Sequence, residues 1–101
     1  MKRLIETRIV NPLLEKYGIP AYKTPGSAGM DLVACIEEAV VIAGGKNKLI
    51  GTGLAVNIQD PGLVAVVASR SGLCLNNQIR VGQGLGIIDA NYHGEIGGYF
   101  A

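Results

Sequence analysis

Three short polar segments carry the residues of this chain that could act on a small ligand. The first is S-A-G-M-D-L, in which Asp31 stands between apolar residues. The second is S-R-S-G at 69–72, and the third is G-L-G-I-I-D-A-N-Y-H-G-E-I at 84–96. The third segment places Asp89 three residues before Tyr92, and a carboxylate beside an aromatic ring suits a small polar ligand.

Each segment also has a purely structural interpretation. Asp31 could cap the backbone N–H groups of a turn, or it could support a hydrated divalent cation. Arg70 could lie on the surface of a turn, or its forked guanidinium could bind phosphate oxygens. Asp89 and Tyr92 could belong to an ordinary hairpin, or Asp89 could accept a proton from a water while Tyr92 stacks on a sugar.

Composition narrows the classes of protein to consider. With 101 residues, 49% of them hydrophobic, we expect a single folded domain over 1–101. A net charge of +1 predicts no binding to nucleic acid or to an anionic membrane. Two isolated cysteines, no long apolar run and no signal-peptide pattern at the start make the cytoplasm the expected compartment.

The elements that must position these side chains are short strands. Fifteen glycines and several apolar, β-branched runs predict an all-β domain. Gly51 and Gly53 predict a bulge or a close approach of backbone, and Asp60-Pro61-Gly62 predicts a turn with Gly62 at positive φ. Helical turns are expected only at 13–19 and 73–78. The predicted strands are 3–10, 30–35, 39–43, 48–50, 52–58, 63–68 and 79–81.

Taken together, the three segments resemble the motifs of a known family, the homotrimeric dUTPases. The residues that carry the resemblance are A-Y-K-T-P-G-S-A-G-M-D-L at 21–32, T-G-L-A-V at 52–56 leading to S-R-S-G-L at 69–73, and G-I-I-D-A-N-Y-H-G-E-I at 86–96. Their order and spacing also match, over about residues 4–96. The resemblance implies a jelly-roll-like β-barrel of the dUTPase (β-clip) type.

The resemblance also implies an activity and an assembly. It implies hydrolysis of dUTP to dUMP and pyrophosphate with Mg²⁺, in a homotrimer with active sites between subunits. Asp89 is then the carboxylate that orients and deprotonates the attacking water. Asp31 is the carboxylate that reaches the metal through water.

The remaining site residues are implied to bind the nucleotide. Arg70, Ser71 and Gly72 resemble the phosphate-binding turn, contributed by a neighbouring subunit. Tyr92 resembles the ring that stacks on deoxyribose and excludes a 2′-hydroxyl. The residues that resemble the lining of the uracil pocket are Gln83, Gly86, Ile87 and Ile88.

The sequence departs from the family pattern at a few positions. The family usually has Pro at Ser69, Asn at Gln83 and Asp at Asn91. The third change removes a negative charge close to Asp89 and is expected to lower its basicity.

The family's chains also continue into further strands, a fourth motif and a Gly-rich arm, whereas this sequence stops at Ala101. We therefore expect a barrel that is incomplete at the C-terminus, with Gly97-Gly98 poor strand formers. Two alternatives to dUTP hydrolysis stay open. One is a catalytically weak or inactive remnant that binds nucleotide or a protein partner, and the other is a plain β-module without a ligand.

Overall fold

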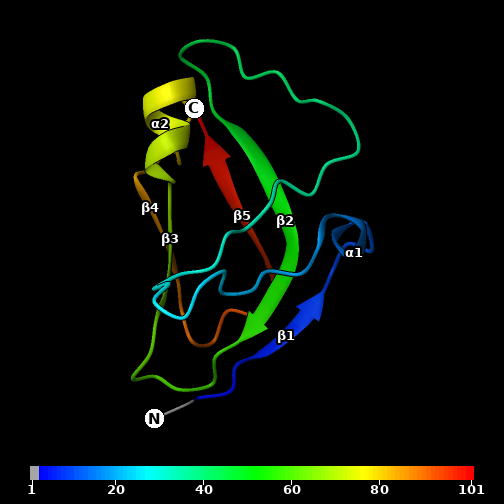
Figure 1. Cartoon of the computed structure of the whole chain (residues 1–101), viewed down its shortest axis with the longest axis vertical. Coiled ribbons are helices and arrows are strands. Elements are labelled where there is room, and N and C mark those ends of the chain that lie inside the picture. Colours follow the sequence, from blue (N-terminus) through cyan, green and yellow to red (C-terminus); the bar gives the residue numbers. More distant parts are fainter. Residues whose placement is uncertain (1–2) are drawn as a thin grey trace.

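The longest strand, β2 (Lys48–Asn57), forms the centre of a three-stranded antiparallel sheet. The computed structural model describes residues 3–101. β1 (Glu6–Ile9) lies along one edge of β2, and β5 (Glu95–Phe100) lies along the other (Figure 1). The predicted strands at the start and in the middle of the chain are therefore confirmed.

The middle of β2 carries the bulge that its glycines predict. The register against β5 shifts between Gly51 and Ala55. Gly53 has a φ of 74°, and a Cβ atom at this position would lie 2.8 Å from the Sγ of Cys35. Because L-residues rarely adopt this φ and no space is left for a side chain, position 53 requires glycine.

A short helix covers the bulged part of β2. α1 (Leu13–Tyr17) contributes Leu14, which is completely buried in a cluster with Cys35 and Leu54. The helix makes a single turn because Gly18, at a φ of 100°, ends it and returns its N–H to the carbonyl of Leu14. The predicted helical turn is confirmed, and this cluster is the core of the three-stranded sheet.

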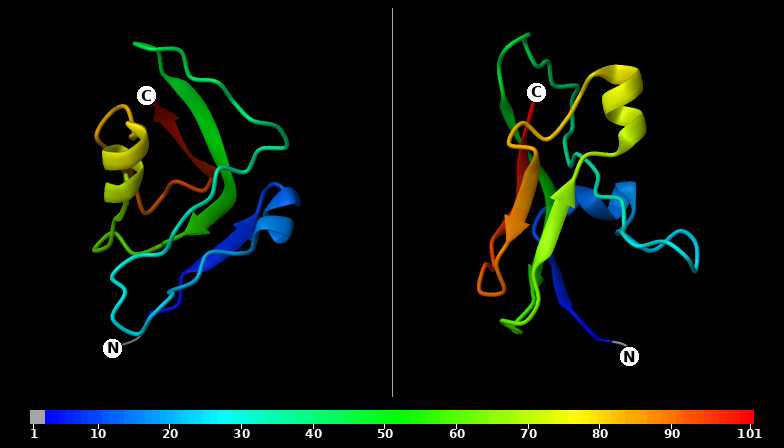
Figure 2. Two further views of the ribbon diagram at one scale, coloured as in Figure 1. Left: turned by 45° about the horizontal axis from the view of Figure 1, so that its top comes forward. Right: turned by 90° about the vertical axis from the view of Figure 1, so that its left-hand side faces the viewer.

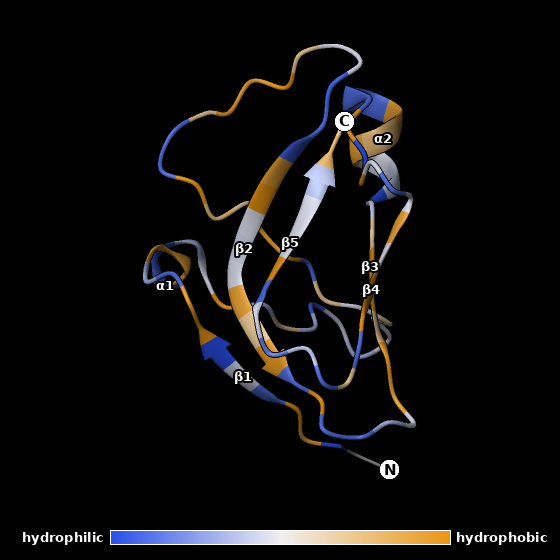
Figure 3. Cartoon of the chain, turned by 180° about the vertical axis from the view of Figure 1, so that it is seen from behind, coloured by the Kyte–Doolittle hydropathy of each residue, from blue (hydrophilic) through white to orange (hydrophobic). Residues whose placement is uncertain are grey.

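A second sheet stands apart from the first. β3 (Ala65–Ala68) and β4 (Leu85–Ile88) pair as an antiparallel two-stranded ribbon, which we call the β3–β4 ribbon (Figure 2). α2 (Ser71–Asn77) follows β3 at one end. Val66 lies opposite Ile87, and both stay more than half exposed. The residues of the ribbon are mainly apolar (Figure 3), and the described chain leaves Val66 and Ile87 uncovered.

Three predicted strands are wrong in whole or in part. The segment 30–35 is irregular and donates one ladder-like hydrogen bond, from Cys35 N to Gly51 O, at 2.9 Å. The apolar run 39–43 is neither a strand nor buried, and 79–81 contributes a single bridge between Val81 and Phe100. Apolar runs predict burial, but a strand also needs a partner strand, and β2 already pairs with β1 and β5.

The segment 84–96 is not a hairpin, which corrects one of the interpretations drawn from the sequence. β4 pairs with β3, whereas β5 pairs with β2. The residues between them, 89–94, therefore cross from the ribbon to the three-stranded sheet. We call this crossing the 89–94 loop.

Two glycine predictions also need correction. The turn after β2 forms, with the Gly62 N–H donating to Asp60 Oδ1 at 2.8 Å, but the positive φ belongs to Gln59, at 59°. Gly97 and Gly98 lie inside β5 as regular strand residues. Cross-strand pairing with β2 thus overrides their low strand propensity.

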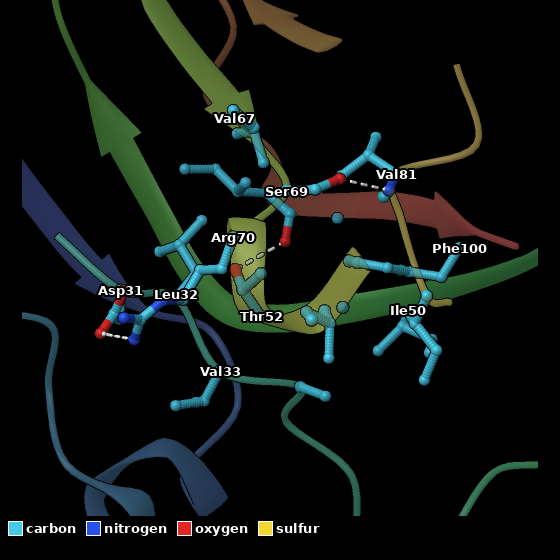
Figure 4. Close-up of a pocket in the computed structure, with 18 of the residues that line it drawn as sticks. Asp31, Leu32, Val33, Ile50, Thr52, Val67, Ser69, Arg70, Val81 and Phe100 are labelled. Carbon is cyan, nitrogen blue, oxygen red and sulfur yellow. Dashed lines mark hydrogen bonds and ion pairs between the residues drawn. The ribbon is translucent and has the colours of Figure 1, made fainter. Parts of the chain in front are cut away.

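The five strands and two short helices within residues 3–101 confirm the all-β class. Across residues 3–101 no helix combines the length and the apolar character needed to cross a bilayer. An apolar cavity of about 460 Å³ opens between the two sheets. Asp31 and Arg70 are the charged residues among those that line it (Figure 4).

Candidate functional site

Two of the predicted site residues, Asp31 and Arg70, lie together at the rim of this cavity. Arg70 Nη1 and Lys23 Nζ each lie 2.8 Å from Oδ2 of Asp31. The carboxylate is one-third exposed, and both cationic side chains are at least 70% exposed. Asp31 is therefore a charged partner of two cations, and among the described residues it makes no hydrogen bond to a turn N–H.

The charges around Asp31 affect its ionisation. The hydrogen bond from Lys23, with the positive charges of Arg70 and Lys23, holds the pKa of Asp31 below its usual value, against the opposing effect of desolvation. Asp31 is therefore ionised throughout the physiological range. Lys23, whose side chain is largely exposed, is also part of this cluster.

The turn at 69–72 holds Arg70 at the end of β3. The Oγ of Ser69 accepts a hydrogen bond from the Val81 N–H at 2.8 Å, which ties the turn to the bridge with β5. Arg70 is extended, and α2 starts directly after it without a side-chain cap. Ser71 and Gly72 are exposed. Their backbone N–H groups stand in the first turn of the helix and therefore lack intrahelical partners.

Gln83 lies at the same end of the ribbon as Arg70. The Gly84 N–H donates to Val81 O at 2.9 Å, and Gly84 takes a φ of 89°, so the chain turns sharply into β4. The exposed Gln83 side chain extends toward Gly86, whose close neighbour is Val67. Gln83 and Gly86 are thus close to each other.

Further along β4, side chains alternate across the ribbon. Ile87 is exposed and Ile88 is buried. β3 occupies one edge of β4, and within residues 3–101 no strand pairs with the other edge. The backbone donors and acceptors on that outer edge are available to a ligand.

Asp89 and Tyr92 lie in the 89–94 loop. The Tyr92 N–H donates to Asp89 O at 3.0 Å, and the Tyr92 hydroxyl donates to the backbone carbonyl of Glu95 at 2.9 Å. The ring lies over Gly94, where an added Cβ would meet the phenol oxygen at 2.7 Å. The loop therefore fixes the ring, while the Asp89 side chain stays exposed without a hydrogen bond among the described residues.

One chain does not bring all the predicted site residues together. Ala68 pairs with Leu85, and Ala65 pairs with Ile88. Arg70 thus follows one end of the ribbon and Asp89 follows the other, roughly 20 Å apart by the rise of extended chain. We call these the Arg70 end and the Asp89 end of the ribbon, and the right-hand view of Figure 2 shows α2 and the 89–94 loop at opposite ends.

The residues present fit a metal ion only in part. Among the described residues no three His, Cys, Asp or Glu side chains form a cluster that could hold an ion by themselves. Mg²⁺, however, retains several waters and often needs only one or two carboxylates beside the phosphates of a substrate. Both cations at Asp31 contact Oδ2, so Oδ1 remains for a metal-bound water.

Two polar residues of the site region escaped the sequence interpretation. The family pattern marks Ser69 only as a departure from proline, whereas its hydroxyl joins the end of β3 to Val81. The sequence pattern predicts no role for Glu95, yet its carboxylate accepts the Gly53 N–H at 2.8 Å. The sequence signal for the Glu95 contact was the pair of glycines in β2 that predicts the bulge, because a bulge leaves backbone N–H groups that a side chain can bind.

Comparison with known proteins identifies relatives of the chain. The dUTPase family model matches residues 15–100. The chain is 46% identical over 94 residues to the deoxyuridine 5′-triphosphate nucleotidohydrolase of Tolumonas auensis, covering 93% of this chain and 60% of the relative. It is 42% identical over 97 residues to that of Pectobacterium carotovorum, covering 95% and 64%. The chain thus spans about three fifths of the length of these curated relatives.

Solved structures agree with this match. A mutant dUTPase from phage phi11 of S. aureus, described as coordinating a structural Mg(II) ion, superposes with a TM-score of 0.83 and 28% identity, over 97% of this chain and 59% of that one. A mutant dUTPase of Staphylococcus bacteriophage 80alpha, solved with dUpNHpp, superposes at 0.80 with 23% identity, over 98% and 59%. The second likeness bears on the fold alone.

Proposed function

Because this chain belongs to the dUTPase family, we propose that it binds dUTP and hydrolyses it to dUMP and pyrophosphate. The observation that carries the proposal is the contrast between its two site carboxylates. Asp31 is paired with two cations, whereas Asp89 is exposed and has no ionic partner among the described residues. Asp89 is therefore the carboxylate that is free to accept a proton.

Asp89 acts in this proposal as a general base. It accepts a proton from a water molecule, and the water oxygen forms a bond to phosphorus as the bond to the pyrophosphate leaving group breaks. The exposed position of Asp89 in the 89–94 loop admits both the water and the nucleotide. Asn91 leaves Asp89 without an adjacent negative charge.

The Arg70 end of the ribbon binds the phosphates. The guanidinium of Arg70 exchanges Asp31 for phosphate oxygens. Ser71 and Gly72, in the uncapped first turn of α2, contribute backbone N–H groups to the same phosphates. Asp31, once released, would be the residue that holds a Mg²⁺ ion through a water. When bound, the ion neutralises charge that develops on the phosphate oxygens.

The nucleoside binds along β4 and the 89–94 loop. Tyr92 stacks on the deoxyribose and leaves no space for a 2′-hydroxyl. The uracil pairs with the open backbone edge near Gly86, Ile87 and Ile88, with Gln83 beside them. Hydrogen bonds to backbone groups suit a base that must be told from cytosine.

We further propose a homotrimer with its sites between subunits. The separation of Arg70 and Asp89 along the ribbon supports this, because one chain cannot place both groups on one triphosphate. The uncovered apolar face of the ribbon also favours association. The free thiols of Cys35 and Cys74 agree with a reducing compartment, which we take to be the cytoplasm.

Pyrophosphate release tests the enzymatic proposal. Purified chain is given dUTP and Mg²⁺, with Asp89→Asn as the matched control. Release above that of the control supports hydrolysis, and equal release would contradict it. Calorimetry with a non-hydrolysable dUTP analogue then separates an inactive binder from a chain with no nucleotide site, which would give no heat at millimolar ligand.

A further inference from the structure

Glu95 makes two contacts that join the 89–94 loop to the three-stranded sheet. Its carboxylate Oε2 accepts a hydrogen bond from the Gly53 N–H at 2.8 Å. Its backbone carbonyl accepts the Tyr92 hydroxyl at 2.9 Å. A single residue thus connects the bulge of β2 with the phenol ring that faces the proposed sugar site.

The bulge is shaped around this carboxylate. A Cβ atom on Gly51 would collide with Oε2 of Glu95, and Gly53 offers its N–H only because the register shifts between Gly51 and Ala55. Glu95 is only partly exposed, whereas Gly53 is buried. A hydrogen bond between a carboxylate and a backbone N–H in such a setting is stronger than one between neutral groups.

The next residue fixes the same stretch a second time. The hydroxyl of Thr52, which is buried, donates to Ile96 O at 2.6 Å. The start of β5 is therefore anchored by both a charged and a neutral hydrogen bond to the bulge. The carbonyl of Glu95, which accepts the Tyr92 hydroxyl, lies between these two anchors along the chain.

We propose that Glu95 is a positioning residue for sugar discrimination. By fixing its own backbone on the bulge, it holds the Tyr92 ring over Gly94 and so excludes a 2′-hydroxyl. This inference rests on the proposed function, in which Tyr92 faces the deoxyribose. Glu95 itself touches no substrate in it.

The first experiment needs no nucleotide. The ring protons of Tyr92 are followed by NMR in the wild type, in Glu95→Ala and in Glu95→Gln, with Glu38→Ala as the control at an exposed glutamate. We expect the Tyr92 signals to shift and average in Glu95→Ala alone, because the glutamine amide oxygen can still accept the Gly53 N–H. Unchanged Tyr92 signals in Glu95→Ala would overturn the positioning role.

The second experiment measures binding of dUMP and of UMP by calorimetry. We expect Glu95→Ala to lower the preference for dUMP over UMP by about tenfold, because the variant loses about one hydrogen bond that holds the Tyr92 ring in place. Glu95→Gln should restore the preference. Equal weakening of both nucleotides would show a merely structural role. If the wild type binds neither dUMP nor UMP, the proposed function fails. The NMR experiment still decides whether Glu95 positions the Tyr92 ring.

A third variant guards against a Glu95→Ala chain that does not fold. Tyr92→Phe removes only the hydroxyl and leaves the carboxylate bound to Gly53. We expect it to lose the same preference for dUMP, and we expect the Tyr92→Phe, Glu95→Gln double variant to lose no more. A Tyr92→Phe chain that keeps the full preference would overturn the inference.

Discussion

The two ends of the β3–β4 ribbon are built from different interactions. At the Arg70 end, long exposed side chains meet in a cluster of two cations and one carboxylate. At the Asp89 end, short bonds to backbone groups fix a ring and a turn, and a partly buried glutamate anchors them. The Arg70 end can rearrange, whereas the Asp89 end is already shaped.

This difference matches what each end is proposed to bind. A triphosphate with its metal ion presents a flexible, highly charged surface, which exposed cations can follow at little cost. A nucleoside presents a fixed shape, which only a preorganised site can distinguish from its ribose counterpart. In our account the Arg70 end therefore holds the phosphates by charge, and the Asp89 end holds the sugar by geometry.

The largest expected effect comes from the Asp89 end. Replacement Asp89→Asn removes the proposed base but keeps its size, so pyrophosphate release should fall by about 10²–10⁴-fold. Binding of dUMP, measured by calorimetry, should stay within a few-fold of the wild type. Matched substitution of Asp60, which lies in a surface turn, should leave the rate unchanged.

The next effect concerns the anchor of that end. Gly53→Ala should destabilise the fold by about 3 kcal/mol, because it combines a strained φ with overlap against Cys35. Gly45 has the same φ of 74° but nothing within 4 Å of its Cβ position, so Gly45→Ala should cost only about 1 kcal/mol. Urea denaturation compares the two, and equal losses would mean that the bulge is not tightly packed.

A smaller effect is expected at the Arg70 end. Arg70→Lys keeps the charge and loses the forked geometry, so affinity for a non-hydrolysable dUTP analogue should fall by about tenfold. Arg80→Lys serves as the control, since Arg80 bonds through its backbone to Ala101. An unchanged affinity in Arg70→Lys would mean that Arg70 acts only as a point charge.

The smallest effect should come from Asp31. Asp31→Asn frees Arg70, so the variant should bind pyrophosphate a few-fold more tightly than the wild type without Mg²⁺. Adding Mg²⁺ should raise the affinity of the variant for pyrophosphate less than that of the wild type. Because the pKa of Asp31 is lowered in the folded chain, its pairing is present above the usual value of 3.8 and is lost as the pH falls through the lowered pKa. The ratio of the pyrophosphate affinities of wild type and variant should therefore be the same at pH 6 and at pH 8. A ratio that fell to one at pH 6 would contradict this.

Local patterns were sufficient to predict much of the fold. The glycines of β2 predicted its bulge. The run 39–43 was misread because composition reports apolar character but not whether a partner strand is available. The supposed hairpin at 84–96 failed for the same reason, since pairing partners are a tertiary property.

The site was harder to predict than the fold. Asp31 and Arg70 are 39 positions apart, and nothing local indicates that they meet. The role of Glu95 depends on the register between β2 and β5, which no single segment encodes. The separation of Arg70 from Asp89 likewise follows from the ribbon's pairing, not from their positions in the sequence.

Subunit complementation tests the central claim most directly. Chains carrying Asp89→Asn and chains carrying Arg70→Ala are co-expressed in equal amounts, and pyrophosphate release from dUTP is compared with that of each variant alone. If each site joins the Arg70 end of one copy to the Asp89 end of another, about a quarter of the wild-type rate should return, because random assembly leaves that share of sites intact. A mixture no faster than its inactive components, beside an active wild type, would contradict the account.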